Sequence, residues 1–204
     1  MLQLCYKNNC VEAGLDEAGR GCLAGPVFAS AVILPSDYSN SLLRDSKTLT
    51  LSQREILRQD IEKNALAFSV SKVDEKTIDR INILQASIKA MHKAIGHLHT
   101  QPQHLIIDGN YFKPYKKTPF KTIIKGDNTY MNIAAASILA KTYRDDWMLK
   151  LSRKYPQYHW DLNKGYGTKK HIDAIRQYGL SPYHRISFQV KSLQLQLFQT
   201  SNTP

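Results

Sequence analysis

The chain has 204 residues, 42% hydrophobic and 22% charged, which is enough for one globular core and excludes a low-complexity or fibrous protein. The sequence shows no secretory signal pattern, and its longest apolar run, 27–34, is too short to cross a bilayer. Three cysteines without disulfide or metal spacing, Cys5, Cys10 and Cys22, favour a reducing cytoplasm.

The net charge of +11 is concentrated in the second half of the chain. Residues 113–191 hold 16 Lys and Arg against 5 Asp and Glu, whereas the rest of the chain holds 12 of each. A solvated surface is one explanation for this asymmetry. Aromatic residues interleave with the cations, which favours nucleic acid, because phosphates attract the charges and bases stack on the rings.

The hydrophobic pattern predicts a series of strands and helices. Strands are expected at five apolar or alternating segments, namely 11–15, 27–34, 66–73, 104–107 and 121–124. Helices are expected at 52–64, 84–98, 130–154, from about 168 onward and at 190–198. A capping-box pattern from Ser52 to Glu55 predicts the first helix start, and small residues on the long helix predict close packing on a sheet.

Strands dominate the first part of the chain and helices the last quarter. This order indicates an α/β sheet domain with a helical appendage. We therefore expect a sheet domain over 1–155 and a helical segment over 156–204, packed together as one unit.

Acidic residues follow three of the predicted strands. Asp16 and Glu17 end the first, Asp108 ends the fourth, and Asp127 follows the fifth. If these strands are neighbours, the four acids gather at one rim. Such oxygens suit two Mg²⁺ or Mn²⁺ ions, which would activate water for phosphoryl displacement. Alternatively, Asp108 and Asp127 are simple turn residues, since both lie beside glycine.

A glycine-rich loop follows the first pair of acids. Gly19 and Gly21 allow the backbone to approach a ligand closely, and Arg20 between them carries donors suited to phosphate. Cys22 has no paired histidine and is interpreted as a packing residue. Trp160 is interpreted as either a core residue or a substrate contact.

The string from Asp16 to Gly21 resembles the opening motif of the type 2 ribonucleases H, the ribonuclease HII family. Further segments resemble that family's motifs in the same order, from about residue 14 to 188. These segments are 45–49, 108–109, 125–127, 134–141, 144–145, 155–156, 164–168 and 184–188.

The resemblance implies a ribonuclease H-like fold with a mixed five-stranded sheet, flanking helices and a C-terminal helical clamp. It also implies that 1–155 is the catalytic domain and that 156–204 binds substrate. It implies an endoribonuclease that uses two Mn²⁺ or Mg²⁺ ions. Nothing in the sequence argues for an oligomer, so we expect a monomer, in the cytoplasm that the cysteines favour. The implied substrates are RNA–DNA hybrids and DNA duplexes containing single ribonucleotides, cut to 5′-phosphate and 3′-hydroxyl ends. The implied catalytic residues are Asp16, Glu17, Asp108 and Asp127, of which the first three bind metal. The implied substrate-binding residues are Gly19, Arg20, Gly21, Lys47 and Tyr166.

Two residues depart from the family's pattern. Asn163 stands where the family usually has histidine, and we expect a tuned substrate contact there. Asp146 stands where arginine is frequent, and Lys150 one turn later is its expected partner.

Three other functions are consistent with parts of the pattern. The first is ribonuclease HIII, which carries an additional N-terminal domain, whereas 15 residues precede Asp16 here. The second is a resolvase or transposase-like nuclease that cuts DNA duplexes. The third is a non-catalytic hybrid-binding module, which the intact set of acids disfavours.

Overall fold

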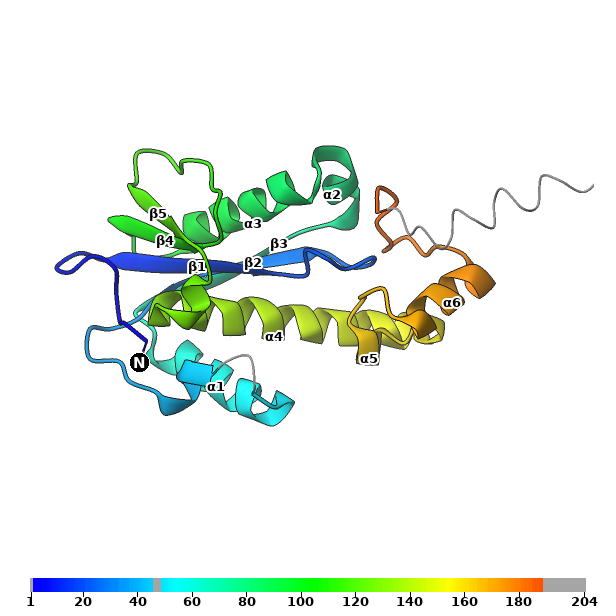
Figure 1. Cartoon of the computed structure of the whole chain (residues 1–204), viewed down its shortest axis with the longest axis horizontal. Coiled ribbons are helices and arrows are strands. Elements are labelled where there is room, and N and C mark those ends of the chain that lie inside the picture. The colour runs from blue at the N-terminus through cyan, green and yellow to red at the C-terminus, as the bar shows by residue number, and fades with distance from the viewer. Residues whose placement is uncertain (1, 46–48, 189–204) are drawn as a thin grey trace, which may run out of the picture.

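The structure, a computed structural model, describes residues 2–45 and 49–188. Lys47 and the helix expected at 190–198 lie outside the described residues. A five-stranded sheet has the order β3-β2-β1-β4-β5 (Figure 1). Its strands are β1 (Glu12–Ala18), β2 (Val27–Ile33), β3 (Ala67–Val73), β4 (His104–Asp108) and β5 (Phe120–Ile123). β1, β2 and β3 pair antiparallel, and β1, β4 and β5 pair parallel, which confirms the predicted mixed sheet.

The helices form layers on both faces of this sheet. They are α1 (Leu51–Asn64), α2 (Glu75–Ile81), α3 (Ile83–His97), α4 (Met131–Lys154), α5 (Trp160–Asn163) and α6 (Lys169–Tyr178). α3 covers one face and α4 the other, with α1 packed on the outer side of α4 (Figure 1). None of the helices in the described ranges is long and apolar enough to span a membrane.

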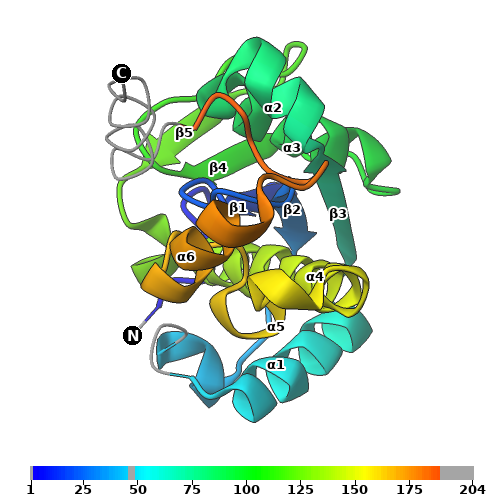
Figure 2. The same cartoon turned by 90° about the vertical axis from the view of Figure 1, so that its right-hand side faces the viewer.

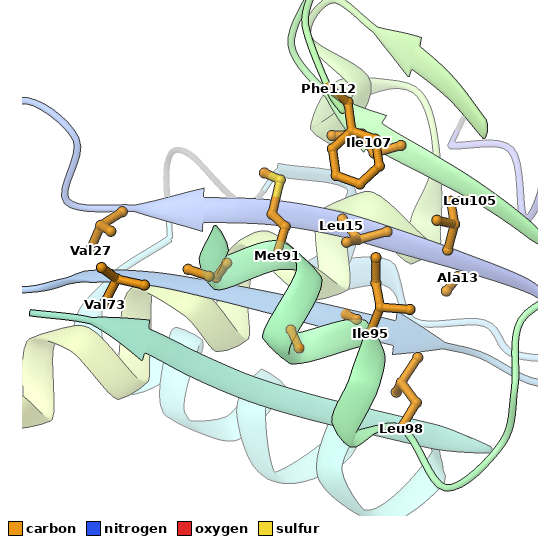
Figure 3. Close-up of a cluster of buried hydrophobic side chains, with 14 of the residues drawn as sticks. Ala13, Leu15, Val27, Val73, Met91, Ile95, Leu98, Leu105, Ile107 and Phe112 are labelled. Carbon is orange, nitrogen blue, oxygen red and sulfur yellow. The ribbon is translucent and has the colours of Figure 1, made fainter. Parts of the chain in front are cut away.

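Alternating residues of β1 supply the two sides of the core. Ala13 and Leu15 point toward α3, where they meet Met91 and Ile95 (Figure 3). Gly14 points the other way, and any side chain there would collide with the backbone of α4. α4 therefore lies directly against the sheet, as its small residues predict.

The structure differs from the predicted elements in three respects. α1 is capped by Thr50 rather than Ser52, because Thr50 and Gln53 form the reciprocal capping box two residues earlier. α2 was not predicted, although Asp74 caps its first turn. β1 extends to Ala18, so the first pair of acids lies inside the strand rather than after it.

Residues 156–188 pack on the end of the sheet where β1 finishes (Figure 2). Trp160, which is fully buried, stacks on Tyr158 and packs against Met148 of α4. It is therefore a core residue and not a substrate contact. α6 begins after Thr168, whose side chain accepts a hydrogen bond from the His171 N–H, as the sequence predicts.

Candidate active site

The pairing of β1 with β4 brings Asp16 and Asp108 side by side. Leu15 lies opposite Ile107 in this parallel pair, so the two acids follow at the same level. Residues two positions earlier on each strand contact α4, and strand side chains alternate between faces. Asp16 and Asp108 therefore both point toward α4, where Ser137 hydrogen-bonds to the buried Asp16 carboxyl.

The carboxyls of Asp16, Glu17 and Asp108 are electrostatically coupled. Burial raises the pKa of Asp16 well above its usual range, and the charges of Glu17 and Asp108 raise it further. Burial also raises the pKa of Glu17, against the opposing effect of Arg20, whose Nη1 lies 2.9 Å from Glu17 Oε1. Each of these acids becomes easier to ionise when a cation is bound nearby.

Asp127 lies in a turn that is fastened to Asp108. The Gly126 N–H donates to Asp108 Oδ1 at 2.7 Å, and Asp127 follows in the 3₁₀ turn Gly126–Asn128 with 8% of its surface exposed. The fourth acid therefore belongs to this turn rather than to the end of β5. The hydrogen bond links its segment to the Asp108 carboxylate.

The donor set fits a hard divalent cation. Within residues 2–45 and 49–188, no three Asp, Glu, His or Cys side chains form a ready-made metal-binding group. Glu17 and Asp108 instead direct oxygens to Arg20 and to the Gly126 N–H. Buried carboxyls that repel one another are nevertheless the oxygen ligands that Mg²⁺ and Mn²⁺ prefer, so the residues present fit such an ion.

The glycine-rich loop and Tyr166 line one cavity of about 280 Å³ beside these acids. Its lining consists of Glu17, Ala18, Gly19, Arg20, Gly21, Ser137, Lys141 and Tyr166. The structure thus brings together Gly19, Arg20, Gly21 and Tyr166, the described residues that the resemblance implies bind substrate, whereas Asn163 does not line this cavity. Ser137 and Lys141 belong to the segment 134–141 that resembles a family motif, but sequence reasoning gave neither a role at the site. Their spacing of four residues on a predicted helix, which places both on one face, is the signal that could have found them.

The two glycines of the loop have different roles. Gly19 has a φ of +93°, and a Cβ atom there would collide with the Arg144 side chain. Gly21 has no atom within 4 Å of the position of a Cβ. Gly19 is therefore required by the fold beneath the loop, whereas Gly21 leaves the outer surface of the loop open to a ligand.

A chain of hydrogen bonds fixes the backbone at Tyr166. His171 Nδ1 lies 2.8 Å from the Tyr166 carbonyl oxygen, so this nitrogen carries the proton. The Ser181 N–H donates to His184 Nδ1, so the His184 proton is on Nε2. Trp160 Nε1–H at 3.0 Å and His184 Nε2–H at 3.1 Å then share the one lone pair of His171 Nε2. Both histidines are thus neutral, and burial lowers their pKa values, that of His184 to about 4. The Tyr166 side chain itself is 46% exposed at the cavity.

The two departures from the family's pattern have structural roles. Asn163 donates to the Tyr158 carbonyl at 2.7 Å and accepts from the Gly165 N–H at 2.8 Å, which braces the turn before Tyr166. The expected pairing of Asp146 with Lys150 is wrong. Asp146 Oδ2 instead lies 2.6 Å from Arg58 Nη1, because the Arg58 side chain extends from α1 to α4 and stacks on Tyr143.

The fold and the site together define a ribonuclease H-like phosphodiester hydrolase, with acids on adjacent strands and a glycine-rich loop beside them. The sequence profile of the family described as Ribonuclease HII matches residues 13–191. The chain belongs to the ribonuclease HII family. It is therefore a ribonuclease H, a hydrolase of RNA–DNA hybrids, and the ribonuclease HIII alternative is not favoured.

Individual proteins show the same relationship. The chain is 56% identical to Ribonuclease HII of Phocaeicola vulgatus over 197 residues, covering 97% of this chain and 98% of that protein. It superposes on ribonuclease H2 from Pyrococcus horikoshii OT3 with a TM-score of 0.75 and 26% identity, covering 92% and 98% of the two chains. Bst-RNase HIII in complex with Mn²⁺ has a TM-score of 0.72 at 18% identity, covering 93% of this chain and 70% of that one, and shows the fold alone.

Proposed function

We propose that this ribonuclease H cuts on the 5′ side of a single ribonucleotide embedded in duplex DNA, leaving 5′-phosphate and 3′-hydroxyl ends. A lone ribonucleotide differs from its DNA context by one hydroxyl, so recognition requires groups that touch the 2′-OH. One observation supports the proposal. Gly19, Arg20, Gly21 and Tyr166, which we propose contact the 2′-OH, line the same small cavity as Glu17.

We further propose that Asp16, Glu17 and Asp108 hold two Mn²⁺ or Mg²⁺ ions and that Asp127 assists at the edge of the site. Such ions, when bound, neutralise the substrate's charge and make a water molecule a better nucleophile. Ser137 orients the Asp16 carboxyl through its hydrogen bond. Arg20 binds Glu17 while its side chain stays 50% exposed at the cavity, where it can meet a substrate phosphate.

The segment 156–204 is proposed to bind the duplex next to this site. Lys169 and Lys170 are exposed at the start of α6, close in sequence to Tyr166. Their positive charges suit the phosphates on either side of a nucleotide held in the cavity. We propose that the enzyme acts as a monomer in the cytoplasm, and Lys47 stays a proposed substrate contact outside the described residues.

The test uses end-labelled duplexes of one sequence with no ribonucleotide, one, four in a row, or a complete RNA strand. We expect Mg²⁺- or Mn²⁺-dependent incision 5′ of the lone ribonucleotide and no cut in the DNA control. Tyr166→Ala should slow cleavage at the lone ribonucleotide far more than Tyr178→Ala, an exposed tyrosine of α6. A wild-type enzyme that needs several consecutive ribonucleotides would contradict the proposal.

A further inference from the structure

Two buried arginines lie beneath the glycine-rich loop. Arg144 of α4 and Arg185 after α6 are each 2% exposed. In the part of the chain that the structure describes, neither makes an ion pair with a carboxylate. A buried guanidinium is costly unless its donors are hydrogen-bonded, so the partners of these two side chains matter.

Arg185 holds both ends of the loop 19–25. Its Nη2 donates to the carbonyls of Gly19 and Gly25, each at 2.7 Å. Its Nη1 donates to the Arg20 carbonyl at 2.9 Å, and its Nε also donates to the Gly25 carbonyl at 2.9 Å. One planar fork therefore fixes three carbonyl groups of the loop.

Arg144 ties the same loop to the turn before Tyr166. It donates through Nε to the Pro26 carbonyl and through Nη2 to the Ala24 carbonyl, both at 3.2 Å. Its Nη1 donates to the Lys164 carbonyl at 2.9 Å. The glycine-rich loop and the turn before Tyr166 are thus hydrogen-bonded to the same buried side chain, Arg144.

These contacts determine which way the loop's peptide groups point. In a trans peptide the N–H points opposite to the preceding carbonyl. Arg185 draws the carbonyls of Gly19 and Arg20 inward, so the N–H groups of Arg20 and Gly21 turn outward. The space around Gly21 on that side is open.

We propose that Arg144 and Arg185 are positioning residues for ribonucleotide recognition. By holding the loop's carbonyls inside the protein, they present the outward N–H groups to the 2′-oxygen and phosphate of one nucleotide. This inference rests on the proposed function at the same site. It requires that loss of either fork loosens the loop without removing the acids that bind metal.

The experiment replaces each arginine with lysine, which keeps the charge and removes the fork. Arg153→Lys, an exposed position of α4, is the matched control. Amide hydrogen exchange of residues 19–25 is measured without substrate. Mn²⁺ affinity is measured by titration, and kcat and KM are measured on the lone-ribonucleotide duplex and on a complete hybrid. We expect loop exchange to rise about tenfold in both variants, with Mn²⁺ affinity unchanged, because charged hydrogen bonds are lost.

The kinetic result separates positioning from general damage. We expect kcat/KM to fall about tenfold more on the lone ribonucleotide than on the hybrid, through loss of aligned hydrogen bonds. Unchanged exchange, equal losses on both substrates, or unfolding of both variants would each overturn the inference. If the wild-type enzyme fails to cut a lone ribonucleotide while loop exchange still rises in the variants, the proposed substrate is wrong. The part of the inference that Arg144 and Arg185 hold the loop is then still supported.

Discussion

The glycines at 19 and 21 allow a matched prediction, because one methyl group added at each position meets different surroundings. Alanine at position 19 must keep a φ of +93°, which costs about 1–2 kcal/mol. Its methyl group also displaces Arg144, and losing one charged hydrogen bond costs a further ~1.5–3 kcal/mol. The total is about 2.5–5 kcal/mol, so the expected fall in Tm for a protein of this size is about 5–20 °C.

Gly21→Ala should leave the stability nearly unchanged and weaken substrate binding. No atom lies within 4 Å of the added methyl, so the free energy of unfolding should change by less than about 0.5 kcal/mol. This is the side from which the proposed substrate approaches, so the added methyl group should keep one phosphate from the backbone N–H and raise KM about tenfold. Thermal unfolding by circular dichroism and steady-state cleavage check both variants. A Gly21→Ala protein as unstable as Gly19→Ala, or one with unchanged KM, would refute this reasoning.

Three further predictions concern the acids, the buried histidines and the basic segment. Asp16→Asn and Asp108→Asn should abolish cleavage while duplex binding, measured by fluorescence anisotropy, persists; near-normal rates at saturating Mg²⁺ would contradict the metal assignment. His184 has a pKa lowered from 6.5 to about 4 in the folded state, so its contribution to stability is complete above pH 6.5 and is lost as the pH falls toward 4. Urea unfolding at several pH values should show this loss, about 3 kcal/mol, and His184→Gln should remove most of it; an unchanged pH profile in that variant would count against the assignment. Lys169→Ala and Lys170→Ala should each reduce the slope of log affinity against log salt by about one, while Lys63→Ala on α1 should not.

Much of the fold could be predicted because its elements have local signals. The apolar segments, the amphipathic face of α3 and the small residues of α4 are visible in the sequence, and each predicts an element that the structure contains. The start of α1 was misplaced because the capping pattern occurs twice, at Thr50 and at Ser52. α2 was missed because one short helix with few buried residues leaves little periodicity.

The acids of the candidate site could be predicted from the sequence, because their side chains identify them. The hydrogen bonds that support the glycine-rich loop could not, because backbone atoms accept them. Asp16, Glu17 and Asp108 stand out as acids beside apolar strands. The partners of Arg144 and Arg185 are carbonyl oxygens, which every residue possesses, so no complementary side chain marks them in the sequence. The hydrogen bond between His171 and His184 could not be predicted either, because the turns of the folded chain bring the two side chains together.

The distance along the chain between Arg185 and its partners has a consequence for the order of biosynthesis. The strands that carry Asp16, Glu17 and Asp108 are complete once Asp108 has been made, but the carbonyls of Gly19 and Gly25 are held by an arginine 166 and 160 positions after them. A nascent chain therefore holds its acids well before its substrate-binding loop takes its final shape. If the two arginines position the loop as proposed, recognition of a ribonucleotide requires that residue 185 has left the ribosome and folded back onto the loop.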